Sequence, residues 1–380
     1  MVEPCPLIEV SGPPRERGRQ YGKQAEARIR KGIAHYGTQL SALGFDRPAI
    51  AGLIDTYLPV MERFEPAYIE EMRGIAEGAS LDFTDIVLIN ARTEILKLGQ
   101  RADLRRKLDE ALGEDGCTGV VVMAEATAAG RLLHAQNWDW KAECAETAVV
   151  LSVTNPDGPD FLTFTEAGGL ARSGLNAAGV AITANYLESD RDYSQLGVPL
   201  PLIRRKVLES EHLALAMRTV YATPKSGSNN MMVSQHGGIA IDFECAPNET
   251  FQVHPDNGLL VHANHWVSPV ALSKLVDTGI ASTPDSLYRD LRVRDLLAPK
   301  RGRITRDDVK TALFDDYQSP WSVCRPPRPS FTTDLSATVA MVVMEPELGV
   351  MEVAMLPALN RTFTSYRLPG APRLTRAAGE

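Results

Sequence analysis

The first 116 residues carry apolar side chains at every third or fourth position, with polar residues between them. This spacing puts the apolar residues on one face of an α-helix. The pattern therefore predicts a helical segment, and Asp82 can cap its last helix. The expected helices cover residues 18–36, 47–77 and 82–98.

Beyond residue 116 the pattern changes to short apolar runs separated by turns rich in glycine, asparagine and alanine. Such runs predict β-strands. We expect strands at 117–123, 131–137, 147–153, 160–165, 180–186, 229–234 and 238–243, and a last hairpin of 337–344 with 349–355. Helical spacing returns at 200–210, 211–220, 285–296 and 305–314. This succession of helices and strands predicts an α+β fold built in layers.

Composition narrows the class of protein. The chain has 380 residues, is 44% hydrophobic and 23% charged, and carries a net charge of −8. These values indicate a globular protein of one or two domains without a nucleic-acid groove. The sequence shows neither an apolar run long enough to cross a membrane nor the pattern of a signal peptide. The five scattered cysteines form no C-x-x-C pair, which favours a reducing cytoplasm over disulfides or structural zinc.

Cys117 has the most informative surroundings. It follows Gly116 and precedes the apolar run 120–123. Glycine has no side chain, so the thiol could approach the Gly116 carbonyl, and the backbone could bend into a strained geometry there. Cleavage between Gly116 and Cys117 would free an α-amine with a pKa of about 7.7–8, which can act as a base near neutral pH. The alternative is a small buried residue before a strand.

A hairpin would bring an aspartate to this cysteine. If residues 117–123 pair antiparallel with residues 132–139, a turn centred near Ala128 places Cys117 opposite Asp139. Opposed residues in such a pair lie about 4.5–5.5 Å apart, so Asp139 could bind and orient the new α-ammonium. The alternative is that Asp139 caps a strand end.

Several segments together resemble a known family. The central match is Asp115-Gly116-Cys117-Thr118, followed by Gln136-Asn137-Trp138-Asp139. These segments resemble the cysteine peptidase family of isopenicillin N acyltransferase and its hydrolase relatives, which are N-terminal nucleophile hydrolases. Weaker matches extend over most of the chain, at residues 12–18 with Gly22, 176–180, 185–186, 262–265 and 322–325.

The resemblance implies a four-layer αββα sandwich. It divides the chain into a helical α part, residues 1–116, and a β part that carries the catalytic core, residues 117–380. We expect the two parts to remain associated after cleavage, because the helical part cannot easily bury its apolar faces alone.

The resemblance also implies roles for individual residues. Cys117 would be the nucleophile, and Arg325 the cation that favours its thiolate. Asn264 and Asn185 would donate to the oxyanion of the tetrahedral intermediate. From the local sequence alone, Arg325 would be a surface residue among prolines and Asn185 a turn residue.

Aromatic residues near these positions could line an acyl pocket or could simply belong to the core. They are Trp138, Trp140, Tyr186 and Trp266.

His262 and His265 suggest a competing metal site, since zinc binds histidine pairs. Residues 258–262 read as a strand that leaves a turn, and on a strand a spacing of three puts the two rings on opposite faces. The sequence therefore argues against this alternative.

The expected protein is an autoprocessing cysteine amidohydrolase or acyltransferase that cleaves a small acylated amine without a cofactor or metal. Acyl transfer from acyl-coenzyme A, a zinc hydrolase using His262 and His265, and an inactive binding protein are the alternatives. Neither nucleic acid nor membrane is an expected partner, and homo-oligomerisation is left open.

Overall fold

The N-terminal helices form as their apolar spacing predicts, with one break. The computed structural model describes residues 2–42, 44–99, 116–329 and 335–371, so Asp115 lies outside it. The helices are α1 (Pro14–Ala42), α2 (Arg47–Phe64), α3 (Pro66–Ala79) and α4 (Phe83–Gly99). The expected single helix 47–77 is wrong, because Glu65 before Pro66 is extended, with φ −159°. A residue before proline disfavours the helical region.

An eight-stranded sheet forms one of the two central layers. It begins with β1 (Leu7–Ser11), a strand that the sequence analysis missed, which pairs in parallel with β4. The first 116 residues are therefore not purely helical. In spatial order the other strands are β4 (Ala148–Thr154), β5 (Phe161–Glu166), β6 (Ser173–Asn176), β7 (Val180–Tyr186), β8 (Asn229–Gln235), β9 (Ile239–Ala246) and β10 (Glu249–Val253).

A seven-stranded sheet forms the other central layer. Its central strands include β2 and β3, in which every residue is buried. Strands that are covered on both faces need not alternate apolar and polar residues. The spatial order is β11 (Leu259–His262), β2 (Gly116–Val122), β3 (Leu133–Lys141), β13 (Leu335–Glu345), β14 (Val350–Met355) and β15 (Thr364–Arg367), and β12 (Arg328–Pro329) pairs with β13.

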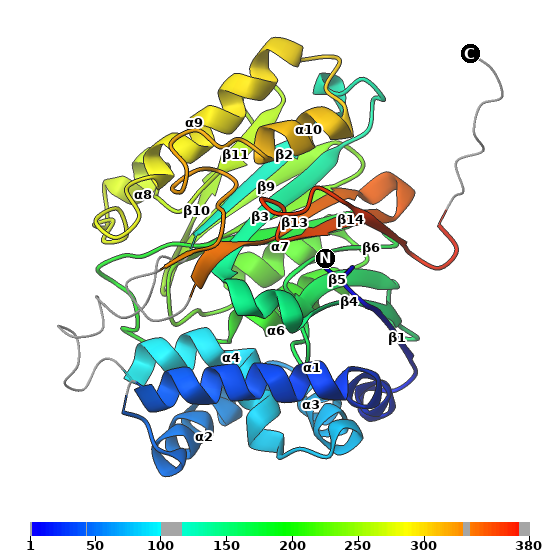
Figure 1. Cartoon of the computed structure of the whole chain (residues 1–380), viewed down its shortest axis with the longest axis vertical. Helices are drawn as coiled ribbons and strands as arrows, with labels where there is room; N and C mark the ends of the chain where they lie inside the picture. The colour runs from blue at the N-terminus through cyan, green and yellow to red at the C-terminus, as the bar shows by residue number, and fades with distance from the viewer. Residues whose placement is uncertain (1, 43, 100–115, 330–334, 372–380) are drawn as a thin grey trace.

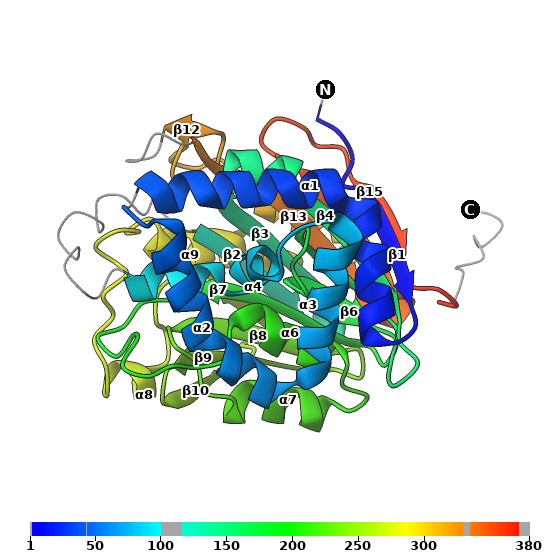
Figure 2. The same cartoon turned by 90° about the horizontal axis from the view of Figure 1, so that it is seen from below.

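Helices cover the outer face of each sheet (Figure 1). The N-terminal helices, with α6 (Leu200–Leu208) and α7 (Leu213–Ala222), pack on the eight-stranded sheet. On the other side, α9 (Ser286–Leu297) and α10 (Arg306–Leu313) pack on the seven-stranded sheet, and the short α8 spans Pro269–Leu272. Figure 2 shows α1 to α4 spread over the sheets from below. The αββα sandwich is thereby confirmed.

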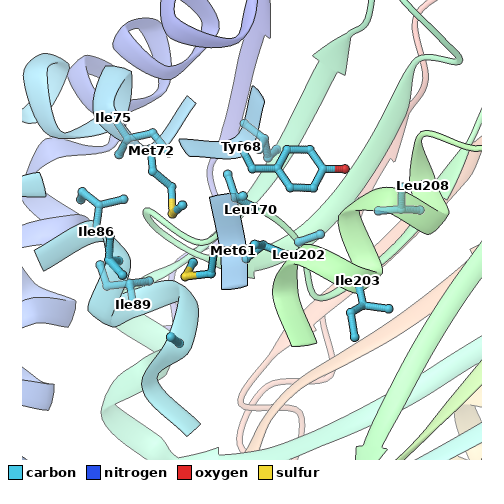
Figure 3. Packing of buried hydrophobic residues seen from close by; sticks show 14 of the residues in the cluster. Met61, Tyr68, Met72, Ile75, Ile86, Ile89, Leu170, Leu202, Ile203 and Leu208 are labelled. Atoms are coloured by element: carbon cyan, nitrogen blue, oxygen red, sulfur yellow. The ribbon is translucent and has the colours of Figure 1, made fainter. Parts of the chain in front are cut away.

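One hydrophobic core joins the segments on either side of Gly116 (Figure 3). Met61, Met72 and Ile86 of the N-terminal helices lie in the same cluster as Leu202 and Ile203 of α6. Burial of such side chains contributes about 1.5–3 kcal/mol each. The two segments therefore cannot separate without exposing a shared core.

Buried charge reinforces this connection. Glu71 of α3 accepts hydrogen bonds from Arg17 of α1 (2.6 Å) and from Arg205 of α6 (2.9 Å). All three side chains are buried. Breaking such a pair leaves an uncompensated charge, which costs about 3–5 kcal/mol.

Glycines allow α1 and α3 to approach closely. Cβ atoms added to Gly18 and Gly22 would overlap with the backbone carbonyl oxygens of Glu71 and Ile75. Gly74 and Gly78 of α3 meet the backbone of α1 in the same way. The glycines at residues 18 and 22, noted above as part of the resemblance, thus serve helix packing.

Candidate active site

The β2–β3 hairpin places Cys117 at the start of a central strand, with a register that corrects the expected one. Gly116, not Cys117, pairs with Asp139, and Cys117 pairs with Trp138. The connection between the strands contains the 3-10 helix Ala124–Ala126, and the paired residues place the centre of the hairpin between Thr127 and Ala128. Because side chains alternate along a strand, the Cys117 thiol and the Asp139 carboxylate lie on opposite faces of the sheet.

Buried side chains hold the backbone of Cys117 on both sides. Its N–H donates to Oδ1 of Asn264 at 2.8 Å, and its carbonyl oxygen accepts from Nη1 of Arg289 at 2.7 Å. Asn264 follows the end of β11, whose last pair is His262 with Gly119. The Asn264 side chain thus continues the ladder of hydrogen bonds where the strand has ended.

Asn264 is itself held from several directions. Its Nδ2 donates to the carbonyl oxygen of Tyr186 at 2.8 Å, and its Oδ1 also accepts from Nη2 of Arg289 at 2.8 Å. Its backbone N–H donates to Oγ of Ser286, at the start of α9, at 2.7 Å. This network fixes which end of the amide faces Cys117: the oxygen faces the nitrogen of Cys117.

Asn185, near the end of β7, contacts the backbone immediately before Asn264. Both hydrogens of its amide nitrogen are used, in 3.0 Å hydrogen bonds to the carbonyl oxygens of His262 and Ala263. Its Oδ1 accepts from Nε2 of Gln136 at 2.8 Å. In this geometry Asn185 holds the turn that carries Asn264.

A cluster of buried charges occupies the face opposite the thiol. Arg325 is fully buried although prolines follow it, because its guanidinium pairs with Asp285, and its Nε lies 3.4 Å from Oδ2 of Asp139. Thr338 of β13 accepts the Arg325 backbone N–H and donates to Oδ1 of Asp139. Arg289 also belongs to this cluster, because its Nε donates to Oδ2 of Asp285 at 2.7 Å. The expectation of a surface arginine from the local sequence is wrong.

Two atoms of this cluster lie over Gly116. A Cβ added there would lie 2.8 Å from both Oδ2 of Asp139 and Nη1 of Arg325. Within the described part of the chain, neither atom has a hydrogen-bond partner. Buried polar groups are rarely left without partners, so such groups often mark functional positions. Burial raises the pKa of Asp139, and the attraction of Arg325 opposes the increase.

The Cys117 thiol faces a pocket on the other side of the sheet. Nη2 of Arg172 lies 3.9 Å from Sγ, and its guanidinium carbon lies 4.1 Å from the centre of the Trp138 ring. The pocket contains about 50 Å³ of space. Besides these residues it is lined by Ile89, Asn90, Arg92, Thr93, Glu94, Thr165, Glu166, Gly169, Ala171, Ala184, Tyr186, Leu200, Pro201 and Arg204.

The four aromatic candidates separate into two pairs. Trp138 and Tyr186 line the pocket. Trp140 does not line the pocket, although it shares a core cluster with Trp138 and its ring centre lies 5.1 Å from the guanidinium carbon of Arg92. Trp266 packs against Phe251. Nε1 of Trp266 donates to the carbonyl oxygen of Glu188 at 2.9 Å, so its position is set outside the thiol pocket.

His262 and His265 lie on the same side of the chain, contrary to the expectation for a strand. Their rings stack with centroids 6.2 Å apart, because β11 ends at His262 and a turn follows. Nε2 of His262 contacts Glu244 at 2.8 Å, and Nδ1 of His265 contacts Ser286 at 2.8 Å. Among the described residues, no group of three or more His, Cys, Asp or Glu side chains could hold a metal ion.

Sequence reasoning missed the charged residues that surround Cys117, which are Arg92, Glu94, Glu166, Arg172, Arg204, Asp285 and Arg289. A signal existed for Asp285 and Arg289, since they are four residues apart at the start of an expected helix, the spacing of a helical ion pair. No local pattern distinguishes Arg172 or Arg204, because only the packing of distant segments brings them to Cys117.

This layered fold, with a buried thiol beside a pocket lined by polar and apolar residues, fits an enzyme of the acyltransferase and amidohydrolase class. The family described as acyl-coenzyme A:6-aminopenicillanic acid acyl-transferase matches residues 126–355, and the chain belongs to this family. The resemblance found in the sequence is thereby confirmed. The matched range begins after Cys117.

The chain is also similar to individual proteins. The chain is 29% identical over 325 residues to the acyl-coenzyme A:6-aminopenicillanic-acid-acyltransferase 40 kDa form of Emericella nidulans, covering 84% of each chain. Similar solved structures include a conjugated bile acid hydrolase from Clostridium perfringens (TM-score 0.46, 13% identity, 66% of this chain and 92% of that one). Another is the Caenorhabditis elegans N-acylethanolamine-hydrolyzing acid amidase ortholog (TM-score 0.44, 15% identity, 67% and 100%). In the described residues no helix is long and apolar enough to span a membrane.

Proposed function

We propose that this protein is a cysteine amidohydrolase that activates itself by cleaving the bond between Gly116 and Cys117. One observation carries the proposal: buried side chains hold both backbone polar groups of Cys117, while its thiol faces a pocket. Any buried residue needs partners for its backbone groups, but a cysteine that only filled the core would need neither a pocket beside its thiol nor an arginine 3.9 Å from its sulfur.

The maturation step converts the peptide bond into a thioester. Sγ of Cys117 attacks the carbonyl carbon of Gly116, the C–N bond breaks, and the nitrogen of Cys117 takes a proton. Water then hydrolyses the thioester, which leaves a carboxylate on Gly116 and a thiol with a free α-amine on Cys117. Nη1 of Arg325 and Oδ2 of Asp139 lie over Gly116, where they can stabilise the oxyanion and the new ammonium.

In turnover the same thiol attacks the carbonyl of an acylated amine. The α-amine takes the thiol proton and delivers it to the leaving amine, and water releases the acyl group. Oδ1 of Asn264 orients the α-amine. Nδ2 of Asn264 has a second hydrogen besides the one bound to Tyr186, and this hydrogen serves the oxyanion.

Nη2 of Arg172 lies 3.9 Å from the thiol sulfur, and we assign Arg172 the direct stabilisation of the thiolate. Arg325 acts on the opposite face, through Asp139 and Gly116. Asn185 acts as a positioning residue for Asn264.

Acyl transfer is the second candidate, and family membership favours it. The acyl-enzyme is common to both reactions, which differ in whether water or an amine accepts the acyl group. If the protein catalyses acyl transfer, acyl-coenzyme A is a substrate. Neither hydrolysis nor acyl transfer by this thiol requires a metal.

The two fragments, residues 1–116 and 117–380, would remain one particle. Support comes from the shared core, the buried Glu71 ion pairs and the pairing of β1 with β4. A cytoplasmic location is also part of the proposal. All five cysteines lie in the described part of the chain as buried thiols rather than disulfides.

The intact mass of the purified protein under denaturing conditions tests the proposal. Two fragments, the larger beginning at Cys117, are expected for the wild type, and one chain for Cys117→Ala. Cleavage that persists in Cys117→Ala would refute self-processing by this thiol. A cleaved wild type that hydrolyses no amide and transfers no acyl group would refute the enzymatic assignment.

A further inference from the structure

The turn that carries Asn264 is held largely by side chains from other elements. It comprises residues 262–268 and begins at the last residue of β11, an edge strand of the seven-stranded sheet. The side chains that bind backbone N–H or C=O groups of this turn are Asn185, Glu244, Asp277 and Ser286. The position of Asn264 therefore depends on residues distant in sequence.

Glu244, in β9 of the eight-stranded sheet, contacts this turn on both sides of Asn264. Its Oε1 accepts the backbone N–H of Val267 at 2.7 Å and contacts Nε2 of His262 at 2.8 Å. Its Oε2 accepts the backbone N–H of Ser268 at 3.1 Å. A single carboxylate thus binds the chain both before and after Asn264.

The hydrogen bonds of His262 require a charged imidazole ring. Its Nδ1 contacts the carbonyl oxygen of Ala263 at 3.0 Å, and its Nε2 contacts the carboxylate of Glu244. A carbonyl oxygen and a carboxylate both accept hydrogen bonds, so both ring nitrogens must donate and carry a proton. Asp242, also on β9, lies 3.8 Å from Nε2 and favours the same charge. His262 and Glu244 therefore form an ion pair.

This ion pair is completely buried. The side chains of Asp242, Glu244 and His262 have no exposed surface. A buried ion pair adds little net stability over apolar side chains of the same volume, because both charges lose their water. It does impose one geometry, since hydrogen bonds to charged groups are directional and roughly twice as strong as neutral ones. A fixed geometry of the turn is the property that this pair supplies.

Asn264 connects this turn to the bond that would be cleaved. Its Oδ1 accepts the N–H of Cys117 at 2.8 Å, and this nitrogen belongs to the peptide bond between Gly116 and Cys117. In the proposed maturation step the same nitrogen is the leaving group. Its placement relative to the thiol therefore affects the rate of attack.

We propose that Glu244 is a positioning residue of this site. By binding the turn on both sides of Asn264, it holds the Asn264 amide against the nitrogen of Cys117. The inference rests on the proposed function and adds a residue that acts on the reaction through Asn264 alone.

The rate of self-cleavage tests this role without knowledge of the substrate. The full chain is made by cell-free translation, synthesis is stopped, and the loss of the uncut chain is followed on a denaturing gel. Glu244→Gln keeps the size of the side chain but replaces one carboxylate oxygen by an NH2 group, which cannot accept a hydrogen bond. We expect the rate to fall by about tenfold, because a displacement of about 1 Å at a reacting group can cost about 100-fold.

A second variant keeps the negative charge. Glu244→Asp is shorter by one CH2 group, so its carboxylate cannot reach both sides of the turn at once, and cleavage should again slow by about tenfold. Thermal unfolding of the purified variants checks that they fold. If neither Glu244 variant folds, Glu244 serves stability alone and the inference is overturned.

Glu345→Gln is the matched control. It also removes a buried carboxylate, which pairs with Arg131 near the far end of β13, about 20 Å along the strand from Thr338. Its cleavage rate should stay within about threefold of the wild type, as expected for an independent site. Equal slowing by Glu244→Gln and Glu345→Gln would assign the effect to general stability and overturn the inference.

A double-mutant cycle separates positioning from stability. Asn264→Ala alone should slow cleavage by about 100-fold. If Glu244 acts through Asn264, adding Glu244→Gln should change that rate by less than about threefold, whereas independent effects would multiply to about 1000-fold.

Multiplied effects, or a wild-type rate in either Glu244→Gln or Asn264→Ala, would overturn the inference and leave the proposed function intact. A wild-type chain that is never cleaved would instead refute the proposed function itself.

Discussion

Asp139 lies directly across the β2–β3 pair from Gly116, and its carboxylate covers the position that a side chain of Gly116 would occupy. The glycine before the thiol is thus required by packing. Gly116 is part of the regular strand β2 and is not among the residues with positive φ, so the strained backbone considered from the sequence is not its reason.

Gly116→Ala should therefore slow self-cleavage. The added Cβ would lie 2.8 Å from Oδ2 of Asp139 and Nη1 of Arg325, so these groups or the peptide bond must shift. A shift of about 1 Å in a reacting group can cost about 100-fold in rate. The time course of the intact mass measures the effect, with Cys117→Ala as the uncleaved reference. Cleavage at the wild-type rate would show that this packing is irrelevant to maturation.

Arg289→Lys should lower turnover in mature enzyme. Arg289 is the residue that binds both the carbonyl oxygen of Cys117 and Oδ1 of Asn264, and a lysine cannot reproduce both contacts. We expect kcat/KM to fall by about 100-fold through misplacement of the nucleophile.

The control for Arg289 is Arg292→Gln on the same helix. Arg292 pairs with Asp315 and is 33% exposed, so its removal should change kcat/KM less than about threefold, as for a surface ion pair. Equal effects of the two substitutions would argue against a specific role for Arg289.

Gly22→Ala and Gly37→Ala should have opposite effects on stability although both lie in α1. A Cβ at Gly22 would overlap with the backbone of α3, whereas nothing lies within 4 Å of a Cβ at Gly37. We expect Gly22→Ala to lose about 2 kcal/mol through overpacking, and Gly37→Ala to gain about 0.5–1 kcal/mol from higher helix propensity. Urea denaturation measures both, and effects of the same sign would contradict the close approach of α1 and α3.

His262 should make stability fall as pH rises. Burial alone would lower its pKa, but the attraction of Asp242 and the hydrogen bond to Glu244 outweigh burial and raise it to about 9. The unfolded chain has a histidine pKa of about 6.5. The contribution of charged His262 to the free energy of unfolding is therefore complete below about pH 6.5. It decreases above that pH and is lost as pH rises through about 9.

The free energy of unfolding of the wild type and of His262→Gln, measured from pH 6 to 8.5, isolates this effect. Their difference should shrink as pH rises. Burial lowers the pKa of His134 to about 3, so its folded form does not titrate in this range. A difference that is constant with pH would refute a charged His262.

Local sequence patterns predicted most of the fold, and long-range packing explains what they missed. The strand at 180–186 agrees with β7 at both ends, because its apolar run is bounded by turns. The short strands β1, β6, β10, β12 and β15 were missed, since their residues form strands only with the partners that the sheets supply. At the site, the hairpin was expected correctly, but the turn geometry shifted its register by one residue. The burial of Arg325 could not be foreseen, because it depends on Asp285 and Asp139, which are distant in sequence.

The parallel pairing of β1 with β4 has a consequence for how the mature particle can be assembled. Leu7 to Ser11 cover the outer edge of β4, and an uncovered edge strand recruits other chains and promotes aggregation. Residues 117–380 synthesised alone would expose that edge. Under the proposed cleavage, the uncut precursor would instead keep the covering strand tethered at a high local concentration while the sheet forms. The bond at Gly116 would then act as an assembly tether, dispensable only once the sheet is complete.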